Sequence, residues 1–195
     1  MNRLLTLLSL LAVASAANAA DTWTIDPRHT SVNFSVRNFF SQVPGSFKVA
    51  SGQIIFDSTN PSANSVEAVI SVGTVNTQEP DRDKHLTNPD FFLVEKFPTA
   101  SFKSTKWEAA GENKFKVTGD LTIKDITKSV TLDVALLGTG PGNRGRTISG
   151  WEATARINRK DWGVSFGGSI GDEVAISISL QAVKQEAAPA AKPGG

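Results

Sequence analysis

The 195-residue sequence contains no cysteine, which excludes a disulfide framework, a lipoprotein anchor and any catalysis that needs a thiol. Histidine is scarce too: His29 and His85 lie in different segments, without the spacing that metal ligands require. The formal net charge is only +1, so the chain lacks the basic excess of a nucleic-acid-binding protein. We therefore expect no metal, no cofactor and no nucleic-acid partner.

The apolar run near the N-terminus is too short for a membrane anchor, because a spanning helix needs about 20 apolar residues. Arg3 precedes a run from Leu4 to about Ala14, and small residues follow at 17–19. This pattern predicts a secretory signal peptide over residues 1–19, cleaved after Ala19. We expect no stable membrane insertion of the mature chain.

Alternation of apolar and polar residues predicts an all-β domain over residues 20–185, with no long helix. The small residues and prolines of 186–195 predict a disordered tail. Eight strands are expected near 32–36, 45–57, 66–72, 100–104, 115–123, 130–136, 151–157 and 174–180, with a short extra strand at 23–26. Eight such strands fit a sandwich or a barrel, and the tight connections between consecutive strands favour an eight-stranded antiparallel up-and-down barrel.

The second predicted strand changes phase along its length. Phe47 and Val49 share one phase, whereas Ile54 and Phe56 share the other. One extra residue at 50–52 explains the change, so we predict a β-bulge there that bends the strand as a barrel requires.

In such a barrel the connections alternate between the two ends. One end receives 38–44, 81–98, the turn at Lys124 and 158–171, which together are long and rich in aromatic residues. The other end receives short polar connections without aromatic residues. We expect a ligand to enter at the aromatic end, although the same rings could instead plug a dry barrel.

The segment Asp81–Pro98 lacks strand periodicity and is predicted to form a short helical or irregular lid over this end. Asp83 and His85 could serve acid–base chemistry. Alternatively, Asp81 caps a short helix that has Asp83 in its first turn and Arg82 as an ion-pair partner. No nucleophile accompanies them, and we expect a protein that is not an enzyme.

Several stretches in order resemble the YceI-like family: WTIDPRHTSVNFSV, PGSFKVASGQIIFD, DRDKHLTNPDFF with KFPTASFKS, VTGDLTIKDITKSVTLDV, GWEATARINRKDWGV and GDEVAISISLQA. The resemblance runs from about Trp23 to Val183. It implies an extended, lipocalin-like barrel, exported to the periplasm, that holds a polyisoprenoid, a quinone or a fatty amide in a tunnel. Many relatives carry histidine where this chain has Asn38, beside the aromatic end, so the preference for a ligand head group could differ here. Many also carry glycine where this chain has Asp125, which affects only a turn.

The motifs and the inward-facing residues together give a set of candidate ligand-binding residues. They are Phe34, Val36, Phe39, Phe40, Phe47, Arg82, Asp83, His85, Leu86, Phe91, Phe92, Phe102, Ile123, Arg159, Trp162 and Phe166. The expected function is a periplasmic carrier of a long-chain isoprenoid or similar amphiphile. The alternative is a ligand-free barrel that serves as an interaction module for a membrane redox or stress-response partner, and a homodimer fits either function.

Overall fold

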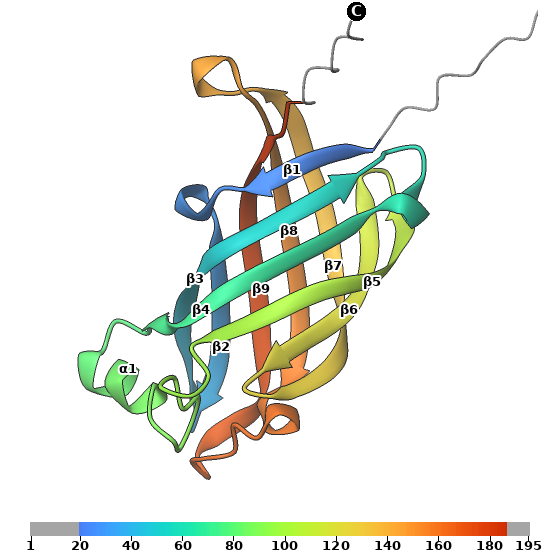
Figure 1. The fold of residues 1–195 in the computed structure, drawn as a ribbon. Helices are drawn as coiled ribbons and strands as arrows, with labels where there is room; N and C mark the ends of the chain where they lie inside the picture. Colours follow the sequence, from blue (N-terminus) through green and yellow to red (C-terminus); the bar gives the residue numbers. More distant parts are fainter. Residues whose placement is uncertain (1–19, 187–195) are drawn as a thin grey trace, which may run out of the picture.

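The strands of the barrel follow one another along the chain in the computed structural model, which describes residues 20–186 (Figure 1). The expected signal peptide, 1–19, and residues 187–195 of the expected tail lie outside the described residues. The strands are β1 (Asp21–Ile25), β2 (Ser31–Asn38), β3 (Ser41–Phe56), β4 (Ser65–Asn76), β5 (Thr99–Gly111), β6 (Lys114–Ile123), β7 (Ile126–Pro141), β8 (Thr147–Asn158) and β9 (Ile170–Lys184).

Strands β2 to β9 each pair antiparallel with the next, and β9 pairs with β2 to close the sheet. This confirms the predicted eight-stranded up-and-down barrel. Helix α1 (Pro80–Leu86) is the one α-helix of the described chain, and within residues 20–186 no helix is long and apolar enough to cross a membrane.

The extra strand β1 shares one position of the barrel with β2. It pairs with the ends of β3 and β9 at the level where β2 no longer reaches them. Between the two strands, the 3-10 turn η1 (Pro27–His29) shifts the chain sideways. Asp26 stabilises this turn, because its carboxylate accepts hydrogen bonds from the Arg28 N–H at 3.0 Å and from His29 Nδ1 at 2.9 Å.

The β-bulge predicted at 50–52 is confirmed by a register shift between Val49 and Ser51 in the pairing of β3 with β4. Gly52 lies next to this shift, at the end of the stretch of β3 that pairs with β1. A Cβ atom at Gly52 would lie 2.4 Å from Ile25 Cδ1 and 2.9 Å from the backbone oxygen of Glu67, so a larger residue would displace the Ile25 side chain and press on β4.

One half of the barrel interior is solidly packed. The ring of Phe56 lies 5.0 Å from that of Trp151, 5.7 Å from Phe115 and 6.3 Å from Trp107. All four come from strand portions near the short polar connections, at the end of the barrel opposite α1 (Figure 1). The tunnel implied by the family resemblance is therefore closed at this end.

The connection between β2 and β3 is shorter than the expected connection 38–44. Asn38 pairs with Ser41, so the connection is a two-residue turn made of Phe39 and Phe40. Pro44 lies within β3, where it is tolerated because the pairing of β3 with β4 begins only at Ser46.

We predict that Asp26→Asn lowers the thermal stability near neutral pH but not at acidic pH. The hydrogen bond from His29 holds the pKa of Asp26 below its ordinary value, against the opposing effect of desolvation. The ionised carboxylate therefore stabilises the fold above its unfolded pKa of about 3.9, and this stabilisation is lost as the pH falls through the lower folded pKa.

Melting temperatures of the wild type and of Asp26→Asn between neutral pH and about pH 2.5 check this prediction. Asp125→Asn, in the exposed turn between β6 and β7, is the matched control. A difference between the wild type and Asp26→Asn that stays constant down to the lowest pH would contradict it.

Candidate functional site

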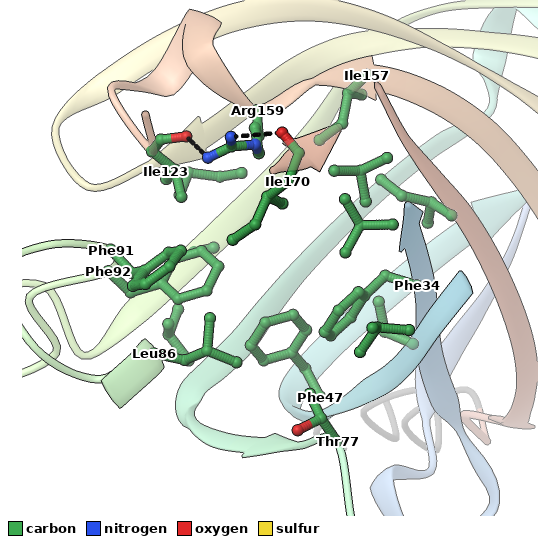
Figure 2. A pocket seen from close by; sticks show the side chains of 18 of the residues that line it. Phe34, Phe47, Thr77, Leu86, Phe91, Phe92, Ile123, Ile157, Arg159 and Ile170 are labelled. Carbon is green, nitrogen blue, oxygen red and sulfur yellow. Dashed lines mark hydrogen bonds between the residues drawn. The ribbon is translucent and has the colours of Figure 1, made fainter. Parts of the chain in front are cut away.

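The half of the barrel nearest α1 holds an apolar cavity of about 330 Å3 (Figure 2). Its wall is built from alternate residues of the surrounding strands, because successive side chains of a strand point to opposite faces. The inward side chains include Phe34, Val36, Phe47, Ile123, Val174 and Ile176. These residues are mostly aliphatic and smaller than the rings that fill the other half, so the interior stays open here.

The aromatic side of the wall depends on a glycine. Phe34 and Phe47 have ring centroids 5.3 Å apart on neighbouring strands. A Cβ atom at Gly45 would lie 2.2 Å from the Phe34 ring, so the glycine leaves the room in which that ring lies flat across β3. The outward neighbour Ser35 instead donates a hydrogen bond to Gln42 at 2.9 Å.

The roof of the cavity is the α1 segment, which we define as residues 77–98. Leu86, Phe91 and Phe92 point from it into the cavity (Figure 2). Phe92 meets the ring of Phe47 edge-on at 5.6 Å, and Phe91 is only 5% exposed. The predicted lid is thus a short helix followed by turns, and its apolar residues face the barrel interior.

A network of hydrogen bonds around Thr77 anchors the α1 segment to the end of β4. The Asp83 carboxylate accepts hydrogen bonds from the Thr77 N–H at 2.8 Å and from its hydroxyl at 2.6 Å. Arg82 donates to the Thr77 hydroxyl at 2.7 Å and to its carbonyl oxygen at 2.9 Å, so its partner is not the carboxylate that we expected. Thr77 was absent from the predicted site, because an isolated threonine between a strand and a helix carries no pattern.

Helix α1 begins two residues earlier than the sequence indicated. Its N-cap is Glu79, which accepts a hydrogen bond from the Asp81 N–H at 3.2 Å, and not Asp81. Pro80 explains the difference, since proline is favoured in the first helical turn, where its missing N–H is not needed.

His85 links the roof to the opposite loop. Its ring meets Phe91 and Phe166 edge-on, each at 5.1 Å, and its Nε2 lies 2.9 Å from the Asp90 carboxylate. Asp83 and His85 therefore have separate hydrogen-bond partners and do not form the acid–base pair considered above. In residues 20–186 no group of acidic and histidine side chains is arranged to hold a metal ion.

Arg159 organises the β8–β9 connection, residues 159–169, on the other side of the cavity mouth. Its buried guanidinium donates hydrogen bonds to five backbone carbonyl oxygens, those of Val164, Phe166, Gly167, Ile170 and Gly171. Figure 2 shows the bond to Ile170. These carbonyls lie in an irregular loop, where they do not take part in the hydrogen-bond ladder of the sheet. The arginine supplies the donors that they need and so fixes the shape of the loop.

Eleven of the sixteen candidate residues line the cavity, and five do not. Phe39 and Phe40 are 66% and 103% exposed at the tip of their turn. Asp83 lies in the network of hydrogen bonds around Thr77, and Phe102 packs in the filled half. Trp162 is buried beneath the loop, where its Nε1 donates to the Leu121 carbonyl oxygen at 3.0 Å and ties the loop to β6.

The cavity also has lining residues that the candidate set did not include. Val43 lines the cavity from the start of β3, which was expected to be a connection. Most of the others share the inward phase of strands already predicted, as do Val32, Ile70, Val72 and Ile157. The strand period could have identified these. Val164 and Ile170 lie in or beside the irregular loop, where no period applies.

We predict that Arg159→Lys lowers the free energy of unfolding by about 2–3 kcal/mol, because a lysine cannot donate to five carbonyls in fixed directions. Chemical denaturation measures the loss, and hydrogen exchange should show faster exchange of amides in 163–171. Arg156→Lys, at an exposed arginine paired with Glu173, is the matched control and should change stability by less than about 0.5 kcal/mol. Equal losses of unfolding free energy in both variants would argue against a role of the Arg159 hydrogen bonds in fixing the loop.

Comparison with known proteins agrees with this architecture. The model of the YceI-like domain matches residues 23–182. Protein YceI of Salmonella arizonae is 38% identical over 185 residues, which cover 93% of this chain and 96% of that protein. BcnA of Burkholderia cenocepacia superimposes with a TM-score of 0.73 at 25% identity, covering 80% of this chain and 98% of BcnA.

A polyisoprenoid binding domain from Saccharophagus degradans superimposes with a TM-score of 0.63 over 86% of this chain and all of that domain. At 17% identity, this likeness concerns the fold alone. The extent of the domain match and the identity to the Salmonella protein, taken with the closed barrel, place the chain in the YceI-like family.

Proposed function

We propose that the protein binds and carries a long-chain isoprenoid or a similar amphiphile, such as a quinone-type lipid or a fatty amide, in the periplasm. The observation that carries this proposal is the apolar cavity in the open half of the barrel, whose polar side chains lie near the mouth. The expected signal peptide supports the location, and the polyisoprenoid binding of the Saccharophagus domain supports the ligand class.

Burial of the ligand chain would supply the affinity. Each buried methylene contributes about 0.8 kcal/mol, so about ten enclosed carbons contribute about 8 kcal/mol before the cost of ordering the ligand. The cavity is closed at its inner end by the aromatic cluster, so the ligand tail would end there and the polar head would stay near the mouth.

Side chains at the mouth would then orient the head group. Arg82, His85 and Asn38 lie around the cavity opening, and Asn38 Oδ1 is buried without a hydrogen-bond partner in the described chain. A hydrogen-bond donor on the ligand head would satisfy this oxygen. In this proposal the α1 segment moves to admit the ligand, because it meets the β8–β9 connection through aromatic contacts of Phe166 with His85 and Phe91.

The two alternatives have less support. A ligand-free interaction module predicts an interior filled by its own side chains, whereas the described barrel is filled in one half only. An enzyme predicts a catalytic pair, whereas Asp83 and His85 bind different partners.

We predict that Ile176→Trp abolishes ligand loading while the barrel still folds. Ile176 points into the cavity, so the indole ring would occupy the space of the ligand tail. Ser177→Trp is the matched control, since the next residue of β9 is exposed on the outer face.

Native mass spectrometry of protein purified from the periplasm without detergent, before and after incubation with a polyprenol, is the measurement. A discrete added mass on the wild type and on Ser177→Trp, absent from Ile176→Trp, would support the proposal. A bare mass for the wild type in both samples would favour the ligand-free module.

We also predict that Phe91→Ala combined with Phe92→Ala shortens the retention of a bound polyprenol, because the roof loses two rings that contact Phe47, His85 and Phe166. The dissociation rate into acceptor vesicles should rise by about tenfold or more. Phe97→Ala, in the same segment but outside the cavity wall, is the matched control. An unchanged rate for the double variant would remove these two rings from the proposed site.

A further inference from the structure

The mouth of the cavity carries exposed aromatic side chains that the ligand site does not use. Phe39 is 66% exposed and Phe40 is fully exposed. Beside them Phe166, which also lines the cavity, is 46% exposed. Phe39 and Phe40 do not line the cavity, and neither ring stacks on another ring within the described residues. It is unusual for two adjacent phenylalanines to be exposed to water at a turn, because burial of a phenylalanine side chain is favourable in free energy.

The backbone of this turn holds the rings outward at a conformational cost. Phe39 has φ 52°, a region that two-residue turns normally fill with glycine or asparagine. Its N–H donates to the Ser169 carbonyl oxygen at 3.0 Å, which fixes the turn against the β8–β9 connection. The exposed position of the two rings is thus fixed by the fold of the turn.

The two segments that meet here carry no charge. Residues 38–47 and 162–171 contain no Asp, Glu, Lys or Arg. They are neighbours, because Asn38 of β2 pairs with Ile170 of β9. We call residues 38–43 and 163–171 together the uncharged rim. The α1 segment, on another side of the mouth, carries both acidic and basic residues.

We propose that the uncharged rim docks on the surface of a lipid bilayer, with Phe39 and Phe40 inserted at the boundary between head groups and acyl chains. Exposed aromatic rings suit that boundary, and the exposed Arg37, which pairs with Gln42 beside the rim, would lie at the level of the head groups. A stable protein partner would need about 800 Å2 of surface on each side, which a two-residue turn tip does not offer.

Docking at the rim would place the mouth of the cavity against the bilayer. Asn38, Val43, Val164, Phe166 and Ile170 belong to the rim and also line the cavity. An amphiphile that crosses the rim passes from the cavity to the bilayer over residues that carry no charge, and the guanidinium of Arg159 beside them is occupied by backbone carbonyls. This transfer of a ligand between the cavity and the bilayer rests on the proposed function, whereas the docking itself does not.

The test is flotation of the mature protein with vesicles of equal parts phosphatidylcholine and phosphatidylethanolamine. The variant is Phe39→Gly combined with Phe40→Ser, in which glycine accepts the positive φ without strain, so the turn should fold. Leu137→Ser is the matched control, because Leu137 is 62% exposed on β7, away from the mouth. We expect the double variant to bind about tenfold less than the wild type and the control.

Binding of the wild type should also persist in about 0.5 M salt, because it depends on apolar contact. Three results would overturn the proposal: no flotation of the wild type, equal flotation of the double variant, or flotation that needs anionic lipid and disappears in salt. A concentration-dependent dimer in sedimentation, lost in the double variant, would assign the rim to a second copy of the chain.

Polyprenol loading, measured by native mass spectrometry on the same proteins, separates this proposal from the previous one. The double variant should load as the wild type does, since neither ring lines the cavity. A wild type that floats with vesicles but takes up no polyprenol would retain the docking surface and contradict the carrier function.

Discussion

The interior of an eight-stranded barrel has to be filled, either by its own side chains or by a ligand, and the rest of this structure depends on how the chain divides that space. Toward the short connections, Phe56, Trp107, Phe115 and Trp151 pack ring against ring. Toward α1, aliphatic residues of the same inward phase leave a cavity whose walls lack van der Waals partners on one side. A bound hydrocarbon chain would supply those contacts.

The mouth of the cavity is held by polar groups that are placed where the strand ladder ends. Arg159 satisfies carbonyls of one loop, and Thr77 with Asp83 anchors the other. Between the two loops, the contacts of Phe166 with His85 and Phe91 are of the edge-on aromatic kind, each worth about 0.5–1.5 kcal/mol. Each loop is therefore fixed in itself, while separating these rings costs little compared with unfolding either loop.

Much of the fold could be predicted from the sequence because a strand buried on one face has a period of two. The phase change between Val49 and Ile54 gave the bulge, and the parity of the connections identified the end that holds the cavity. Details set by local geometry could not be predicted. Pro80 moved the N-cap to Glu79, and a two-residue turn carried Phe39 and Phe40 away from the interior.

The boundary between the filled and hollow halves was the least predictable feature. Phe102 and Ile123 share the inward face of neighbouring strands, yet one packs in the core and the other lines the cavity. Their height along the barrel axis depends on the stagger of all eight strands, which no single strand encodes. The period assigns the face of a residue, and only the closed sheet assigns its level.

The mouth itself is divided into two sides of different chemistry, and under the proposed function this division would orient an amphiphile. On the α1 side, Arg82, His85 and Asp90 offer charges and hydrogen-bond partners. On the side of the turn at Phe39, residues 38–43 and 163–171 carry no charged side chain, and the guanidinium of Arg159 is occupied by carbonyls of the loop. A polar head is stabilised on the first side, and an apolar chain meets no desolvation penalty on the second. Under the carrier function that we propose, an amphiphile that leaves along this side would keep its polar head near the α1 side and its chain out of water.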